Sequence, residues 1–179
     1  MNTTTLAVGA VVLAALAATG CGATAAPDRA AKTDACPVAG FASPYQHIDP
    51  CSAEDVLHAA VTAIFDYRPA EDPDPRAAFV RARPLLQARL AAQAEHAAGV
   101  WAPITTSQWH RWRQQQVPVT ARATVTGDDH PADTNETVDR VLAVSLSVGD
   151  TPVAEFAVYA SAERDVGGPW LLSGLGVRS

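Results

Sequence analysis

The chain has 179 residues and a formal net charge of −6, with 13 basic against 19 acidic side chains. This balance excludes a protein that binds nucleic acid non-specifically, since such binding needs a basic surface. The length suits one domain with a moderate core. The 37 alanines and 12 arginines, against one lysine, indicate GC-rich codons and hence a high-GC bacterium such as an actinobacterium.

The first 27 residues carry no charged side chain, and their densest apolar run covers residues 6–18. As a helix this run would extend about 20 Å, which is short of the hydrocarbon core of a bilayer at about 30 Å. Such a run followed by small residues is typical of a signal peptide, which we expect at residues 1–20. The alternatives are an uncleaved anchor that reaches Ala26 and a buried N-terminal helix.

The stretch AATGC at 17–21 resembles a bacterial lipobox, in which cleavage precedes a cysteine that is acylated, for example with palmitate. Gly20 and Cys21 match this pattern, whereas Ala18 replaces the usual Leu, Val or Ile, and the segment MNTTT lacks Lys and Arg. The resemblance implies that Cys21 is the lipidated first residue of the mature protein, at the extracytoplasmic face of the cell membrane. Ordinary cleavage and secretion is the alternative.

Residues 21–35 have almost no large apolar side chain, so they cannot bury enough surface to fold. We therefore expect a flexible tether that follows the lipidated cysteine. Cys36 and Cys51 are the two cysteines that then remain in an exported chain. A disulfide between them would close the Pro-rich loop 36–51 and stabilise the fold by about 3 kcal/mol. Two unrelated reduced cysteines are the alternative.

A domain is expected over residues 52–179, and it begins with a helix. Ser52 followed by two acidic residues predicts the helix start. Pro69 predicts its end near residue 67 or 68. Apolar residues at helical spacing form its buried stripe, namely Leu57, Val61, Ile64 and Phe65.

A second helical segment is expected to start with Asp74 as its cap and Pro75 as its first residue. Pro84 should split this segment, and Gly99 should end it. Its buried side should contain Phe79, Leu86 and Leu90. A short third helix or a turn is expected over 107–116.

From residue 117 the apolar residues alternate with a period of about 2, which predicts strands at 117–125, 138–148, 152–163 and 169–177. A long polar loop precedes the second strand, and the sequence GD at 149–150 predicts a hairpin turn. Val141 and Val153 make both faces of the sheet partly apolar. The core strand positions should be Val138, Leu142, Val144, Leu146, Phe156 and Val158.

Helices followed by antiparallel strands indicate the α+β class, with N-terminal helices packed on one face of a curved four-stranded sheet. A long first helix ending in IFDY, two more helical pieces and a hairpin-linked sheet closing with GPWLLSGL resemble the nuclear transport factor 2-like (SnoaL-like) superfamily. The likeness covers residues 52–179 and implies a cone-like domain. The stretch FDYRPAEDPDPRAAFVRARPLL also resembles exported actinobacterial proteins related to periplasmic scaffold subunits of conjugation and type IV secretion machines.

Enzymes of this superfamily hold an Asp or His at the mouth of the cone as a general acid or base. The resemblance therefore points to a candidate pocket formed by Asp66, Tyr67 and His110. In the alternative interpretation, Asp66 faces solvent and Tyr67 packs at the end of the first helix. No catalytic residue is assigned, because nothing in the sequence shows that Asp66 and His110 meet.

A candidate partner surface is formed by Trp109, Arg111, Trp112 and Arg113, which are residue types enriched at the energetic centres of protein interfaces. We expect at least one of the two indoles to be exposed. The alternative is an amphipathic turn that places a Trp in the core and the arginines outside.

The five histidines have no metal-binding spacing and no neighbouring cysteine, so neither a metal site nor a cofactor is expected. The leading hypothesis is a non-enzymatic, lipid-anchored cell-envelope protein that binds an envelope partner or acts as a scaffold in a conjugation or secretion machine. The alternatives are a SnoaL-like small-ligand carrier or enzyme that uses an apolar cavity in the cone, and an adhesion or immunity-related lipoprotein without a pocket. A deep cavity would favour the carrier or enzyme, whereas a filled core with an exposed Trp would favour the scaffold.

Overall fold

The computed structural model describes residues 37–178 of the chain. The expected signal peptide at 1–20, Cys21, the tether to residue 35 and Cys36 lie outside these residues. None of the helices formed by residues 37–178 has the length and hydropathy needed to traverse a bilayer.

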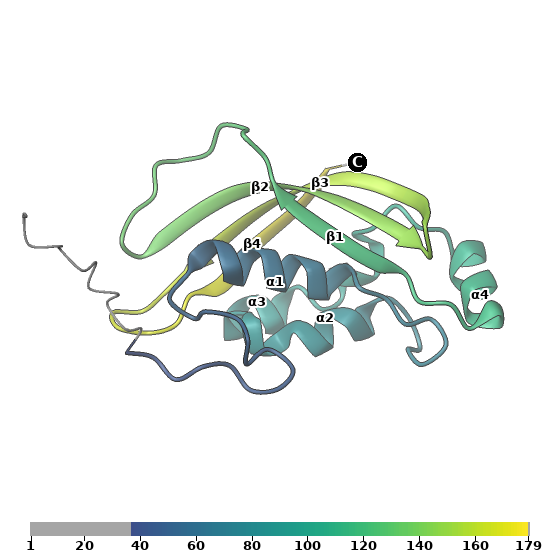
Figure 1. Ribbon diagram of the computed structural model, residues 1–179, viewed down its shortest axis with the longest axis horizontal. Coiled ribbons are helices and arrows are strands. Elements are labelled where there is room, and N and C mark those ends of the chain that lie inside the picture. The colour runs from purple at the N-terminus through teal and green to yellow at the C-terminus, as the bar shows by residue number, and fades with distance from the viewer. Residues whose placement is uncertain (1–36, 179) are drawn as a thin grey trace, which may run out of the picture. The chain divides into compact units, whose positions relative to one another are not determined.

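Within these residues, helices precede one four-stranded antiparallel sheet with the strand order β1-β2-β3-β4, which confirms the α+β class (Figure 1). The helices are α1 (Ala53–Phe65), α2 (Arg76–Ala82), α3 (Ala88–Gln93) and α4 (Thr106–Gln115), with short 3-10 helices η1 (Arg83–Leu85) and η2 (Ala97–Val100). The strands are β1 (Thr120–Val125), β2 (Thr137–Val148), β3 (Thr151–Glu163) and β4 (Leu171–Arg178).

The first helix, α1, begins where the sequence offers a cap. The Ser52 hydroxyl accepts a hydrogen bond from the backbone N–H of Asp55 at 3.2 Å, which satisfies one of the free amides of the first turn. Glu54 and Asp55 place negative charge at the positive end of the helix dipole. The expected start is therefore confirmed, and the whole expected apolar stripe of α1 is buried.

The helix α1 ends at Phe65, earlier than the expected end at residue 67 or 68. Asp66 adopts an extended backbone, and Tyr67 pairs with Val119 ahead of β1. The N–H of Tyr67 and the N–H of Val119 each donate to the other residue's carbonyl at 2.9 Å. These bonds to the edge of the sheet take the place of another helical turn.

The second helical segment is divided at Pro84, as expected, because η1 contains this proline. Phe79 and Leu86 are buried, and Leu90 packs partly buried against the core. However, α3 already ends at Gln93, and Gly99 lies within η2, so the expectation that Gly99 ends the helix is wrong. None of the residues of α3 is fully buried, so little tertiary packing supports a longer helix there.

The observed strands agree closely with the expected ones, except at the start of β1. β1 begins at Thr120 rather than at 117, because the Val117 N–H donates to the Trp112 carbonyl at 3.1 Å and Pro118 has no N–H for a ladder bond. β2 and β3 form a hairpin at 149–150, where Gly149 has a φ of +57°. This left-handed backbone favours glycine.

One face of the sheet and the helices enclose the core. The expected core strand positions are all buried, namely Val138, Leu142, Val144, Leu146, Phe156 and Val158. α1 contacts all four strands. Phe65 of α1 meets Phe156 of β3 edge to face, with ring centroids 5.0 Å apart. Packed side chains therefore fill the region between α1 and the sheet.

Candidate functional site

The three residues of the expected pocket do not converge in the structure. Tyr67 is fully buried, which raises the pKa of its hydroxyl, and this hydroxyl has no hydrogen-bond partner among residues 37–178. His110 is exposed on α4. Asp66 is half-buried and lines a surface recess that neither of the other two residues reaches. Of the alternative interpretation, the packing of Tyr67 at the end of the helix is confirmed, whereas Asp66 is half-buried rather than facing solvent.

The expectation of an exposed indole at the candidate partner surface is wrong. Trp109 and Trp112 are each only 5% exposed, because both face the core one helical turn apart on α4. Trp109 packs edge to face on Tyr67, with ring centroids 5.8 Å apart. The two large aromatic side chains therefore hold α4 on the domain and are not available to a partner.

The two arginines of that segment have different fates. Arg111 is exposed on α4. The guanidinium of Arg113 donates to the Pro69 carbonyl at 2.7 Å from Nε and also to the Asp72 carbonyl. Arg113 therefore fixes the linker that follows α1, which is a structural role.

The described residues do form a groove, but it lies on the solvent side of α1. Its volume is about 590 Å³, within the range of about 300–1,000 Å³ that is common for ligand sites. One wall is the loop before α1, with Pro44, Tyr45, His47 and Ile48, and the end is formed by Arg68 and Arg81. The other wall is the α1 stripe of His58, Ala59, Thr62 and Ala63, followed by Asp66 just after the helix.

The loop wall of this groove is attached to the domain at several points. The Tyr45 hydroxyl donates to the Arg81 carbonyl at 3.1 Å, and the Trp170 N–H donates to the Pro50 carbonyl at 2.9 Å. Cys51, at the end of the loop, is disulfide-bonded. Its pairing with Cys36 stays a prediction, since Cys36 lies outside the described residues.

Burial perturbs two titratable groups of the groove, because it raises the pKa of the Tyr45 hydroxyl as well as that of Asp66. Burial raises the pKa of the Asp66 carboxyl above the ordinary value. The backbone N–H of Ala121 and the positive charges of Arg68 and Arg81 oppose this effect. Arg81 also donates to the Asp66 carbonyl at 2.9 Å and pairs with the buried carboxylate of Asp72. Arg81 therefore has a structural role, because its guanidinium is already bonded within the domain. The Arg68 guanidinium pairs only with the exposed Glu71, at 3.7 Å.

A second recess of about 550 Å³ lies at the β1 edge of the sheet beside α1, and it shares His58 and Thr62 with the groove. The two recesses therefore meet along α1, and we call them together the α1 trough. The second recess adds Thr120–Val125, Ser145 and Ser147 to the lining. The charged side chains of the trough are three arginines against one carboxyl, namely Arg68, Arg81, Arg122 and Asp66. Tyr45, His47 and His58 are its other titratable groups.

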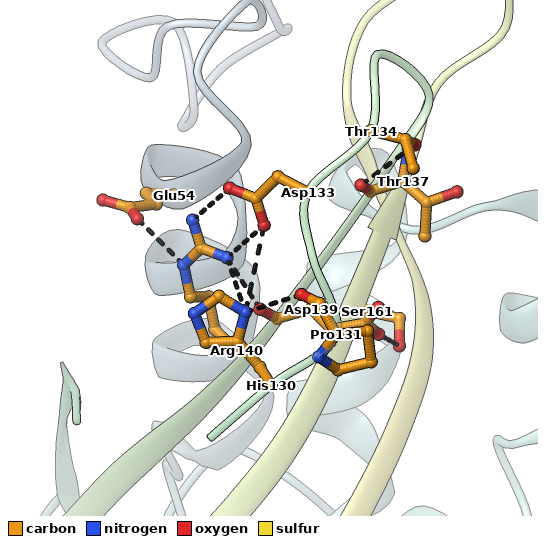
Figure 2. A network of polar contacts seen from close by, with 9 residues as sticks. All are labelled: Glu54, His130, Pro131, Asp133, Thr134, Thr137, Asp139, Arg140 and Ser161. Atoms are coloured by element: carbon orange, nitrogen blue, oxygen red, sulfur yellow. Dashed lines mark hydrogen bonds and ion pairs between the residues drawn. The ribbon is translucent and has the colours of Figure 1, made fainter. Parts of the chain in front are cut away.

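A smaller recess of about 260 Å³ lies on the face of the sheet opposite the core, next to a polar network (Figure 2). Arg140 donates to Glu54 of α1 at 2.9 Å and to both carboxylate oxygens of Asp133 at 2.7 and 2.8 Å. The Ser161 hydroxyl donates to Asp139. Hydrogen bonding to Asp133 raises the pKa of Arg140. The network attaches the polar loop before β2 to β2 and α1. Its charged groups are therefore already paired with one another.

No known protein family, curated protein or solved structure matches the chain. The resemblance to the nuclear transport factor 2-like superfamily therefore stays a prediction. Within residues 37–178, no group of three or more His, Cys, Asp or Glu side chains is arranged to hold a metal ion.

The α1 trough was not expected from the sequence, because its walls come from segments far apart in the chain. One signal was nevertheless present. The positions 58, 59, 62 and 63 form a second stripe on α1, opposite the apolar stripe, with small residues at 59 and 63. Small residues on the outer face of a helix leave room for another segment beside it.

Proposed function

We propose that this protein is a non-enzymatic binding or scaffold protein of the cell envelope, lipid-anchored through Cys21, that receives an envelope partner in the α1 trough. The observation that carries the proposal is the trough itself, which is open to solvent, has apolar positions along its floor and lies beside a filled core. In this proposal the helices and sheet are a cone-like nuclear transport factor 2-like domain, and the tether of residues 21–35 gives it reach from the membrane. A conjugation or secretion machine is the proposed setting.

The lack of a catalytic constellation supports binding without turnover. Asp66 stands in the groove without Tyr67 or His110, so it has no acid–base partner from the expected set. His47 and His58 line the same groove, but neither forms a hydrogen bond or ion pair with the Asp66 carboxyl within residues 37–178. A carboxyl without such a partner can hydrogen-bond to a ligand, but it supplies only one half of a general acid–base pair.

The test places a photo-crosslinking amino acid at position 63, in the groove, and separately at position 111, on exposed α4, in the full chain in its native bacterium. The expected result is a crosslinked envelope protein from position 63 and none from position 111. Mass spectrometry of the same protein should show a mature N-terminus at an acylated Cys21. Equal crosslinking from both positions, or an intact Met1, would overturn the proposal.

A second candidate function is a small-ligand carrier, and one observation favours it. The groove has the volume of a ligand site and contains a carboxyl whose pKa is raised by burial. Native mass spectrometry of protein purified from its host should then detect a bound small molecule. Filling the groove with Ala63→Trp should abolish that bound mass, while Arg111→Ala should leave it unchanged.

A further inference from the structure

The α1 trough has a charge opposite to that of the molecule that contains it. Arg68 and Arg122 line it against the single carboxyl of Asp66, while the charge of Arg81 is compensated by its partner Asp72. The whole chain, in contrast, has a net charge of −6. A local cationic lining on an acidic protein attracts carboxylates and repels basic partners.

Two of these arginines are free to meet a ligand. Arg122 is exposed on β1, and no hydrogen bond or ion pair forms to its side chain within residues 37–178. Arg68 is 51% exposed and reaches Glu71 only at 3.7 Å, and an exposed pair of this kind contributes little. Arg81, by contrast, is held by Asp72 and is not counted as a ligand group.

The shape of the trough favours a chain over a compact molecule. Its two recesses, of about 590 and 550 Å³, meet at His58 and Thr62 and run from the loop at Ile48 to β1. The first recess is the more apolar of the two, and Ile48, Ala59 and Ala63 can surround one side chain there. An elongated site with one apolar recess and a polar extension fits an extended peptide with a single apolar anchor.

We propose that the α1 trough binds an extended acidic peptide of a partner protein, with one apolar side chain between Ile48 and Ala63 and carboxylates at Arg68 and Arg122. This inference rests on the proposed function and adds the chemical class of the partner. The apolar contact supplies affinity, and the arginines supply selectivity and a salt-dependent rate of association.

The test is an NMR titration of the full exported domain with three acetylated, amidated peptides. The first has the sequence Asp-Glu-Leu-Asp-Glu, the second replaces Leu by Ser, and the third replaces all four acids by Lys. The first peptide should shift the amide signals of Thr62, Ala63 and Arg68, the second should bind more weakly, and the third should cause no shift. Arg68→Glu and Arg122→Glu should each weaken binding about fivefold, and Arg111→Glu, an exposed control, should leave it unchanged.

Other outcomes separate this inference from the proposed function. If position 63 crosslinks a partner but the acidic peptide causes no shift, the peptide class is wrong and the proposed function stands. If phosphatidylglycerol vesicles bind through Arg68 and Arg122 and the peptide does not, the occupant is a lipid surface and the inference is overturned. If neither crosslinking nor peptide binding occurs, both proposals fail.

Discussion

The Arg81–Asp72 pair should contribute much more stability than the Arg76–Asp74 pair, although the chemistry of the two pairs is the same. Asp72 is 6% exposed and accepts hydrogen bonds from the Arg68 N–H at 3.1 Å and from the Arg81 guanidinium. Arg81→Met keeps the apolar stem but removes both this contact and the bond to the Asp66 carbonyl. It leaves the buried carboxylate of Asp72 with a single backbone donor.

The expected magnitude follows from burial. Removing one partner of a fully buried pair costs about 3–5 kcal/mol, because the other charge stays buried without compensation. The Arg81 side chain retains 31% exposure, so water partly replaces it, and about 2–3 kcal/mol is the reasonable cost. For a domain of this size that lowers the melting temperature by about 6–10 °C. Arg76→Met breaks a pair with 46% and 33% exposed side chains and should cost less than about 1 kcal/mol.

Urea denaturation of the two variants and the parent measures the difference directly. In a double-mutant cycle, adding Asp72→Asn to Arg81→Met should restore a large part of the lost free energy of unfolding, because the unpaired carboxylate is then absent. If Arg81→Met lowers the free energy of unfolding no more than Arg76→Met does, burial does not determine how much each pair contributes to stability, and the reasoning is refuted.

Reduction of the Cys51 disulfide should lower the free energy of unfolding by about 3 kcal/mol, and peptide mapping should identify Cys36 as its partner; an unchanged melting curve with reductant would exclude a structural role. Phe65→Ala should cost about 3–5 kcal/mol in urea denaturation, since the side chain is fully buried, and a loss below about 1 kcal/mol would contradict the packing described. Burial raises the pKa of Asp66 above 3.8, so the folded protein keeps this proton where the unfolded chain releases it. The stability of the parent relative to Asp66→Asn should therefore fall as the pH rises from 3.8 through the raised pKa. Thermal denaturation of both proteins against pH measures this difference, and a rise over the same range would contradict the prediction.

Local signals predicted the elements that depend on local chemistry. The Ser52 cap and the apolar stripe located α1, and alternation located β2 and β3 to within a residue at each end. The hairpin at Gly149 followed from the same reasoning, because a tight turn there needs left-handed backbone. In these cases the deciding interactions lie within a few residues of one another.

The expectations that failed depend on contacts between distant segments. Trp109 is buried because Tyr67, far back in the chain, lies against it, and no pattern within α4 reveals this. In the same way, the end of α1 is decided by Val119, and the groove around Asp66 exists only because the loop at Tyr45 docks on Arg81. Periodicity shows which face of a helix is apolar, but not which neighbour covers a face of mixed character.

If the protein is lipid-anchored through Cys21, as proposed, the attachment of the loop before α1 has a mechanical consequence. Any pulling force enters the domain through residue 37 and is carried along the loop that forms one wall of the groove, up to Cys51. With the predicted bridge to Cys36, the load instead passes across the disulfide to the start of α1, and the loop is left slack. A cross-link at this position would thus shield the binding wall from tension between the membrane and a bound partner.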